Sequence, residues 1–203
     1  QNILDVGKVN DTTYGIATST NAWGLFTNPV LLEKAGADEF AGGSWDDYTD
    51  WMKTVTDASG GEYWGGSDYT GRIQNFELQL RAEGGNLFTE DGKPGFDEAR
   101  LKAFWEEGQS IRDGIGAPQQ TVEEALPLGP FDTALTASEL TWDNFGAGYL
   151  GNLGADYSEL GLVAPPVTKE GAKDLYLKPS MLHSIAANTD HPEAAATLVN
   201  FLV

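Results

Sequence analysis

The chain has 203 residues, of which 40% are hydrophobic and 11% aromatic, so it is long and apolar enough to fold around a buried core. It carries 31 acidic and 12 basic side chains, a formal net charge of −19. This charge excludes nucleic acid as the main partner, because phosphate binding depends on clustered Lys and Arg. The lack of cysteine excludes disulfide scaffolds, thiolate catalysis and cysteine-based zinc sites.

Every apolar stretch is far shorter than a membrane-spanning helix, so we expect no direct membrane insertion of this segment. The sequence starts at Gln1 and shows no signal peptide. We therefore expect a processed protein or a piece of a longer one.

The first predicted elements are an extended segment and a short helix. Residues 7–28 contain β-prone stretches and are expected to be extended. The helix begins after Asn28, a good N-cap, and Pro29 suits its first turn. Gly36 ends the apolar run and is expected to stop the helix.

Three longer helices follow, beginning at Ser44, at residue 73 and at Asp97, and the last is expected to reach residue 112. Residues 63–66 are predicted as a short strand, and residues 87–96 as a hairpin around the turn at Asp91. The side chains expected to face the core from these helices are Trp45, Tyr48, Met52, Val55, Phe76, Leu78, Leu80, Leu101, Phe104, Trp105 and Ile111.

The second half of the sequence alternates between strands and helices. A short helix is predicted at 122–126, then a strand at 133–137 that runs into an aromatic loop at 141–145. Strands at 161–166 and 182–187 follow, and a closing helix starts at His191-Pro192. This alternation predicts an α/β fold with a mixed central sheet flanked by helices.

Catalysis has no support in the residues. The sequence lacks a G-x-S-x-G nucleophile elbow, a Walker loop and an H-E-x-x-H zinc helix. Carboxylates do occur in pairs, but adjacent acids on a helix point apart, whereas a glycosidase needs two that face each other. The sequence has only two histidines. We expect no catalytic residue, no metal site and no cofactor.

Tryptophans outside the helices are the one chemical signal. Trp23, Trp64 and Trp142 stand beside polar or glycine residues. An aromatic face next to amide, carboxylate and guanidinium groups is the chemistry that grips a sugar, because the ring covers C–H groups while polar groups bind hydroxyls. Each of these tryptophans could equally be ordinary core filler.

Ordered motifs give this signal a context. Residues 14–36, YGIATSTNAWGLFTNPVLLEKAG, resemble the extracellular solute-binding proteins of sugar ABC importers, the broad family that includes maltose-binding protein. SWDDY at 44–48, GGNLF with DGKP at 84–94, LVAPP at 162–166 and HPEAA at 191–195 resemble further motifs of that family, in the same order.

The resemblance implies one lobe of a type II periplasmic-binding-protein-like fold. In that family the motif at 14–17 lies about a quarter to a third of the way along the chain, after most of the N-terminal lobe. Residues 1–203 would therefore form a C-terminal-type lobe, with hinge-crossing segments near 10–20 and 160–190. The N-terminal lobe would be largely absent.

The resemblance also places ligand contacts. Asn21 stands where maltose-binding protein has a polar contact to its ligand. Trp23 is two residues further along, so it would share the same face if the segment is extended. Arg72, Gln74 and Asn75 stand where maltose-binding protein has a carboxylate and aromatic contacts to its ligand. This exchange of residue types would replace ring stacking by hydrogen bonding.

Later in the chain, Trp142 is the nearest candidate for the family's stacking tryptophan, and two carboxylates flank it. Ser180 precedes the returning strand. The complete predicted ligand-binding set is Asn21, Trp23, Arg72, Gln74, Asn75, Glu139, Trp142, Asp143 and Ser180.

The function implied is a carbohydrate-binding component of an ABC importer that captures a mono- or oligosaccharide between two lobes and delivers it to the permease. The implied location is extracellular or periplasmic, with a lipid anchor in the full-length protein. Two alternatives stay open: a glycoside hydrolase fragment using acids such as Glu139 and Asp143, and a free-standing carbohydrate-binding module.

Overall fold

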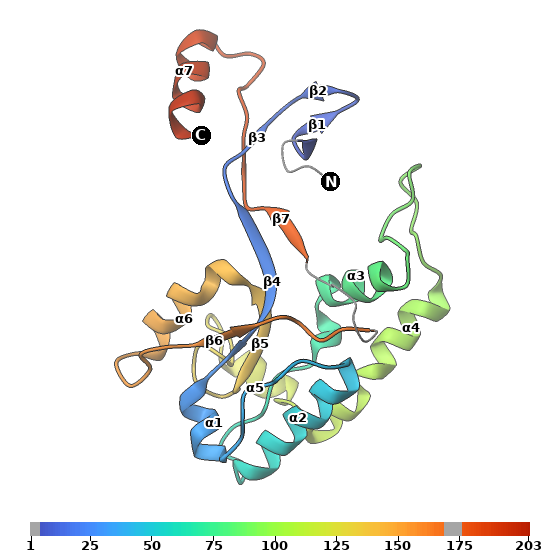
Figure 1. Cartoon of the computed structure of the whole chain (residues 1–203), viewed down its shortest axis with the longest axis vertical. Coiled ribbons are helices and arrows are strands. Elements are labelled where there is room, and N and C mark those ends of the chain that lie inside the picture. The colour runs from blue at the N-terminus through green and yellow to red at the C-terminus, as the bar shows by residue number, and fades with distance from the viewer. Residues whose placement is uncertain (1–4, 169–175) are drawn as a thin grey trace. The chain divides into compact units, whose positions relative to one another are not determined.

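The computed structural model describes residues 5–168 and 176–203 (Figure 1). The chain divides into two compact units, Gln1–Ala22 with Tyr176–Val203, and Trp23–Leu175. Every buried hydrophobic side chain among the described residues belongs to the second unit. That unit therefore contains the hydrophobic core.

The sheet of the second unit is centred on β4 (Thr20–Thr27), whose residues from Trp23 onward are all buried. It pairs antiparallel with β5 (Ser138–Trp142) on one side and β6 (Gly161–Val163) on the other. The strand predicted at 161–166 is thereby confirmed in its first half. Parallel pairing among the described residues is limited to two isolated bridges, 44 with 167 and 64 with 136.

Local capping chemistry fixes the first helices where the sequence predicts them. In α1 (Pro29–Ala35) the Asn28 side chain accepts from the Leu31 amide, and Gly36 ends the helix at a φ of 62°. In α2 (Trp45–Ala58) Ser44 and Asp47 form a capping box. The four side chains predicted to face the core from α2 are all buried.

The helix predicted from residue 73 is confirmed as α3 (Ile73–Ala82). The hairpin predicted at 87–96 is confirmed by an antiparallel bridge between Phe88 and Pro94. α4 (Glu98–Glu107) ends earlier than predicted, and a π-helical turn, η3 (Ile111–Ile115), follows. The prediction that Trp105 faces the core is wrong, because this side chain is 54% exposed. It is the neighbour of buried Phe104, and consecutive helical residues point about 100° apart.

The connection between α4 and β5 differs most from prediction. α5 (Gln119–Glu124) starts three residues before the predicted helix. The predicted strand at 133–137 is wrong: the Pro130 carbonyl accepts from the amides of Leu135 and Thr136, which curls this segment into a turn, and β5 begins only at Ser138. The predicted strand at 63–66 is reduced to the bridge at Trp64.

The predicted aromatic loop is also replaced by regular structure. Its first two residues extend β5, and the next three form a 3-10 turn, η4 (Asp143–Phe145). α6 (Gly146–Leu153) then follows, a helix the sequence did not predict because its three glycines are poor helix formers. Packing supplies the missing stability, since Tyr149 of α6 meets Phe26 and Phe131 edge-on, with ring centroids 5.4 and 4.8 Å away.

The first unit is built from short strand pairs and one helix. β1 (Lys8–Val9) pairs with β2 (Thr12–Thr13), β3 (Ile16–Ala17) with β8 (Leu182–His183), and β7 (Leu177–Pro179) with the first residues of β4. The closing helix is confirmed as α7 (Pro192–Leu202). Phe201 of α7 is 83% exposed, so the apolar side of this helix is not buried against a core within this unit.

Candidate functional site

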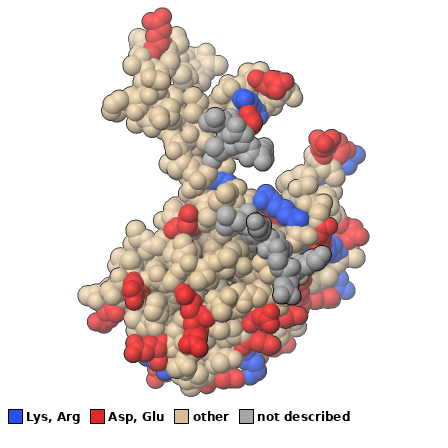
Figure 2. Space-filling model, in the orientation of Figure 1, with Lys and Arg blue, Asp and Glu red and all other residues tan. Residues whose placement is uncertain are grey.

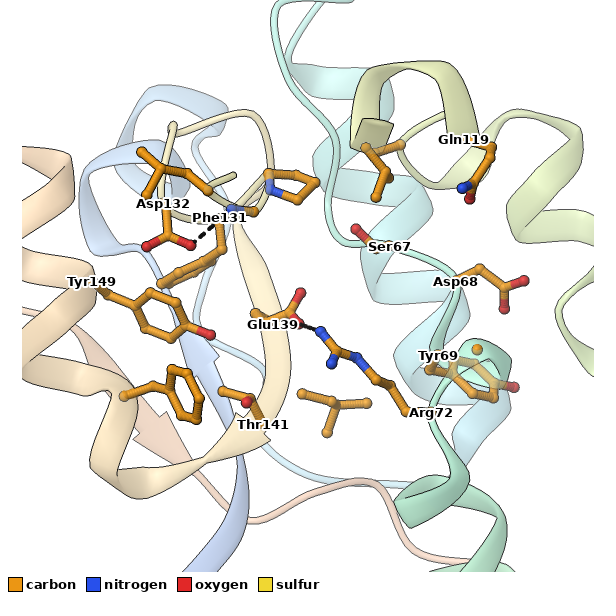
Figure 3. A pocket seen from close by; sticks show the side chains of 18 of the residues that line it. Ser67, Asp68, Tyr69, Arg72, Gln119, Phe131, Asp132, Glu139, Thr141 and Tyr149 are labelled. Carbon is orange, nitrogen blue, oxygen red and sulfur yellow. Dashed lines mark hydrogen bonds and ion pairs between the residues drawn. The ribbon is translucent and has the colours of Figure 1, made fainter. Parts of the chain in front are cut away.

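The second unit contains a cavity of about 880 Å³ between two walls (Figure 3). One wall is formed by β5 and α6, and the other by the segment 67–72, which includes the short helix η2 (Tyr69–Gly71). The connections at 117–122 and 127–132 close the remaining sides. The lining is mixed, with aromatic rings, carboxylates, guanidinium groups and hydroxyls.

Strand periodicity places the polar groups of the β5 wall. Glu139 and Thr141 are two residues apart, so they project from the same face of β5, and both line the cavity. Figure 3 shows Glu139 on β5, with its carboxylate directed toward Arg72 of the opposite wall.

An ion pair joins the two walls. Arg72 Nη2 donates to Glu139 Oε1 at 2.6 Å, and the two side chains are 53% and 11% exposed. Burial raises the pKa of Glu139 above its ordinary value, Arg72 opposes this shift, and the nearby Asp132 adds to it. The pair presents N–H donors and carboxylate lone pairs side by side.

A second ion pair lies in the same lining. Arg112 Nη1 contacts Asp68 Oδ2 at 2.5 Å. Asp68 is itself fixed, because its Oδ1 accepts from the Thr70 amide at 2.9 Å and caps η2. Arg112 also donates to the carbonyl of Trp105 at 2.6 Å. Both members of this pair are therefore tied to the backbone.

Aromatic rings form the α6 side of the cavity. Tyr149 is buried against the core, and burial raises the pKa of its hydroxyl, with a further contribution from Glu139. The hydroxyl therefore stays protonated at neutral pH. Phe145 lines the same cavity, is 48% exposed and lies 5.9 Å from Tyr149 between ring centroids. It offers an accessible apolar face beside polar groups.

Two further polar groups complete the lining. Ser67 lines the cavity, and its Oγ is buried without a hydrogen-bond partner within the described structure. Asp132 lies on the opposite side, where it accepts from the Gly129 amide at 3.1 Å and from Asn152 Nδ2 at 2.6 Å. Asp132 is thus oriented by two donors before any ligand arrives.

Of the predicted site residues, Arg72 and Glu139 line this cavity and contact each other. Trp23 and Asn75 do not offer a surface, which corrects the expectation that they touch ligand. Trp23 is 2% exposed and Asn75 fully buried, and the indole Nε1 donates to Asn75 Oδ1 at 2.8 Å. Trp23 lies on the buried part of β4 and Asn75 in the first turn of α3, and both side chains are part of the core.

The other predicted residues lie apart from the lining of this cavity. Trp142 pairs directly across from Trp23 and packs edge-on against it, with centroids 5.0 Å apart. Asp143 is in η4, and Gln74 is half-buried in the first turn of α3. Asn21 and Ser180 belong to the first unit, where the Ser180 amide donates to the Ser19 carbonyl.

Sequence reasoning missed several lining residues. Tyr149 was missed because its helix was not predicted, and Asp132 because it lies just before the predicted strand at 133–137, in a connection where no motif singled it out. Only the register of β5 could have singled out Thr141 with Glu139. The missed polar and aromatic lining residues are Tyr48, Ser67, Asp68, Tyr69, Arg112, Gln119, Phe131, Asp132, Thr141, Phe145, Tyr149 and Asn152.

Two further properties bear on chemistry. Within residues 5–168 and 176–203, no group of three or more acidic or histidine side chains is arranged to hold a metal ion. Over the same ranges, no helix has the length and apolar character needed to cross a bilayer.

The sequence matches the family described as bacterial extracellular solute-binding protein over residues 1–203. The chain belongs to this family. Membership confirms the resemblance inferred from the ordered motifs, and the coarse function follows: it is part of a solute-binding protein.

Solved structures agree with this assignment. A family 1 extracellular solute-binding protein from Alicyclobacillus acidocaldarius is 29% identical, with a TM-score of 0.73 over 98% of this chain and 50% of its own. A substrate-binding protein from Listeria monocytogenes in complex with cycloalternan is 18% identical, with a TM-score of 0.78 over 100% and 51%. A periplasmic oligogalacturonide-binding protein from Yersinia enterocolitica is 21% identical, with a TM-score of 0.73 over 98% and 51%.

These structures confirm the α/β fold of substrate-binding proteins. The chain spans about half the length of each of them. That share is the size of a single lobe.

Proposed function

We propose that this chain is one lobe of a carbohydrate-binding protein that captures a mono- or oligosaccharide and delivers it to the permease of an ABC importer. The observation that carries the proposal is the cavity of the second unit, where the Arg72–Glu139 pair lies among an exposed phenyl ring and an unpartnered hydroxyl. Family membership makes the chain a solute binder, and this lining favours a sugar as the solute.

The lining matches the chemistry of a pyranose. Sugar hydroxyls donate and accept hydrogen bonds, and a guanidinium beside a carboxylate serves both needs at once. The face of Phe145 covers C–H groups, and each such contact is worth about 1 kcal/mol by analogy with aromatic pairs. A few charge-assisted hydrogen bonds at about 1.5–3 kcal/mol each bring the affinity to the micromolar range.

The exposed apolar side chains of the first unit support the proposal of a two-lobed protein. Its described residues contain no buried hydrophobic side chain, although several large apolar side chains are exposed on it. Burying such a surface requires another part of the protein. Together with the half-length match to solved structures, this supports crossings toward a second lobe near residues 10–20 and 160–190, of which 169–175 lie outside the described residues.

The transport role follows from closure of two lobes around the ligand. Closure would hide the sugar from water, and the closed form would be recognised by the permease. We place the protein outside the cell membrane, extracellular or periplasmic and held by a lipid anchor in its full-length form. The acidic surface of the second unit (Figure 2) is consistent with an exported soluble domain.

Binding without turnover is the proposed activity. Glycoside hydrolysis needs one protonated and one ionised carboxyl facing the scissile bond. Here Glu139 is paired with Arg72, and Asp132 accepts from two donors, so both are held as acceptors. Hydrolysis of aryl glycosides with a bell-shaped pH profile would favour the enzyme instead.

Isothermal titration calorimetry on the intact protein that carries this chain tests the proposal. The panel contains glucose, galactose, galactobiose, maltotriose, glucuronate, galacturonate and digalacturonate, with leucine and spermidine as non-sugar ligands. At least one carbohydrate is expected to bind with a dissociation constant of about 10 µM or tighter. Binding of leucine or spermidine with silence across the carbohydrates would reject a sugar as the solute.

Trp142 stays a predicted ligand contact, because the cavity described here is confined to one unit. Trp142→Ala in the intact protein is expected to weaken sugar binding about tenfold if its ring meets ligand in the closed form. Trp142→Phe is the matched control, since it keeps an aromatic face. Unchanged affinity in the alanine variant would assign Trp142 to core packing.

A further inference from the structure

The cations of the cavity are already neutralised, and this bears on which sugars fit. The described lining residues include two basic side chains, Arg72 and Arg112. Each is ion-paired to a carboxylate that also belongs to the lining, Glu139 in one case and Asp68 in the other. With Asp132 added, three carboxylates oppose two guanidinium groups, which leaves one excess negative charge in the lining.

We propose that this cavity selects neutral sugars over uronates, and that Glu139 is the residue that determines the selection. This inference rests on the proposed carbohydrate function. A uronate carboxylate would have to share Arg72 with Glu139 or Arg112 with Asp68, so its charge would meet a guanidinium group that is already neutralised. It would do so next to Asp132, at a cost in repulsion and desolvation.

A neutral hydroxyl meets no such obstacle. Arg72 is 53% exposed and uses one of its nitrogens on Glu139, so further N–H groups remain for hydroxyl oxygens. Glu139 Oε1 accepts from Arg72, and the carboxylate keeps lone pairs for a hydroxyl proton. The ion pair therefore binds a hydroxyl while staying intact.

The surroundings reinforce this selection. Acidic side chains are spread over the visible face of the second unit with few basic ones among them (Figure 2). The chain as a whole carries a formal charge of −19. An anionic sugar is therefore disfavoured in its approach as well as in its binding, and the first effect weakens with salt.

The test compares matched pairs in the intact protein: glucose with glucuronate, galactose with galacturonate, and galactobiose with digalacturonate. The neutral member of the best-binding pair is expected to bind at least tenfold tighter. Glu139→Gln releases Arg72 and is expected to raise affinity for the uronate about tenfold while weakening the neutral sugar. Glu77→Gln is the matched control, because Glu77 pairs with Arg81 on α3 outside the cavity lining.

Asp68→Asn serves as a second variant in case Glu139→Gln fails to fold. It releases Arg112 and keeps an oxygen to cap η2. It too is expected to raise uronate affinity. A wild-type preference for the uronate, or no gain in uronate affinity in the folded variants, overturns the selection but leaves carbohydrate binding intact. Silence toward all seven carbohydrates, these six sugars and maltotriose, overturns the proposed function and the selection together.

Discussion

The side chains of Trp23 and Asn75, 52 residues apart in the sequence, form one buried unit in which the indole Nε1 donates to the amide Oδ1 at 2.8 Å. Asn75 in turn donates from Nδ2 to the Tyr69 carbonyl at 2.8 Å. This chain of bonds links the central strand β4 to the start of α3 and to η2. It therefore sets the position of the wall that carries Arg72.

Removing this link is expected to destabilise the fold. Asn75→Ala leaves the Trp23 N–H without a partner in the core, and a buried unpaired group costs about 1–3 kcal/mol. It also removes one of the two hydrogen bonds that the Tyr69 carbonyl accepts, the other coming from the Arg72 amide. We expect a loss of about 3 kcal/mol in the free energy of unfolding, measured by urea denaturation. Gln120→Ala, an exposed amide on α5, is the control and is expected to change stability by less than about 0.5 kcal/mol. Equal effects of the two variants would contradict the structural role of Asn75.

Phe145 is expected to contribute to affinity more than to stability. Phe145→Ala removes a ring that is 48% exposed and lines the cavity, so we predict about tenfold weaker sugar binding by calorimetry. Phe88→Ala, on the exposed hairpin and outside the lining, is the control and is expected to leave affinity unchanged. If Phe145→Ala binds sugar as wild type does, this ring is not a ligand contact.

The pH dependence of stability is expected to report the environment of Glu139. Burial raises its folded-state pKa above the ordinary value of 4.5, so the folded state holds this proton more tightly than the unfolded state. The stability contributed by this group is complete below the unfolded-state pKa, and it falls as pH rises to the folded-state pKa.

Urea unfolding of wild type and Glu139→Gln between pH 4 and pH 8 isolates this effect. The wild-type stability relative to the variant is expected to decline as pH rises through that interval. A relative stability that instead grows with pH would mean that the ionised pair with Arg72 outweighs burial.

The capping box of α2 gives a local prediction. Ser44→Ala removes the Oγ that accepts from the Asp47 amide at 3.0 Å, and loss of such a cap costs about 1 kcal/mol. Ser110→Ala is a matched control, because Ser110 precedes η3 without a side-chain cap bond. Thermal unfolding of both variants checks the prediction. An equally small change in melting temperature in both would mean that the Ser44 cap does not stabilise α2.

The first unit is expected to be less protected than the second when the 203-residue chain is studied alone. It has exposed apolar side chains and no buried one among its described residues, whereas α2 packs four buried side chains. Hydrogen exchange followed by mass spectrometry is expected to show faster exchange in α7 than in α2 by at least about tenfold. Comparable protection would show that this unit needs no second lobe.

Local chemistry determined much of the fold from the sequence. The caps at Asn28, Ser44 and Asp97 and the stop at Gly36 act within a few residues, so the helices they bound were predictable. The ordered motifs likewise fixed the family. Arg72 and Glu139 were placed in the site by resemblance, but nothing in the sequence showed that they pair with each other.

Tertiary structure decided the rest, because the deciding contacts join residues that are distant in the sequence. Arg72 and Glu139 are 67 positions apart in the sequence, and they meet because the segment 67–72 lies across the cavity from β5. Tyr149 forms part of the cavity only because packing against Phe26 stabilises a glycine-rich helix. Trp23 was taken for a ligand contact because its neighbours in sequence are small or polar, but its neighbours in space are those of a core.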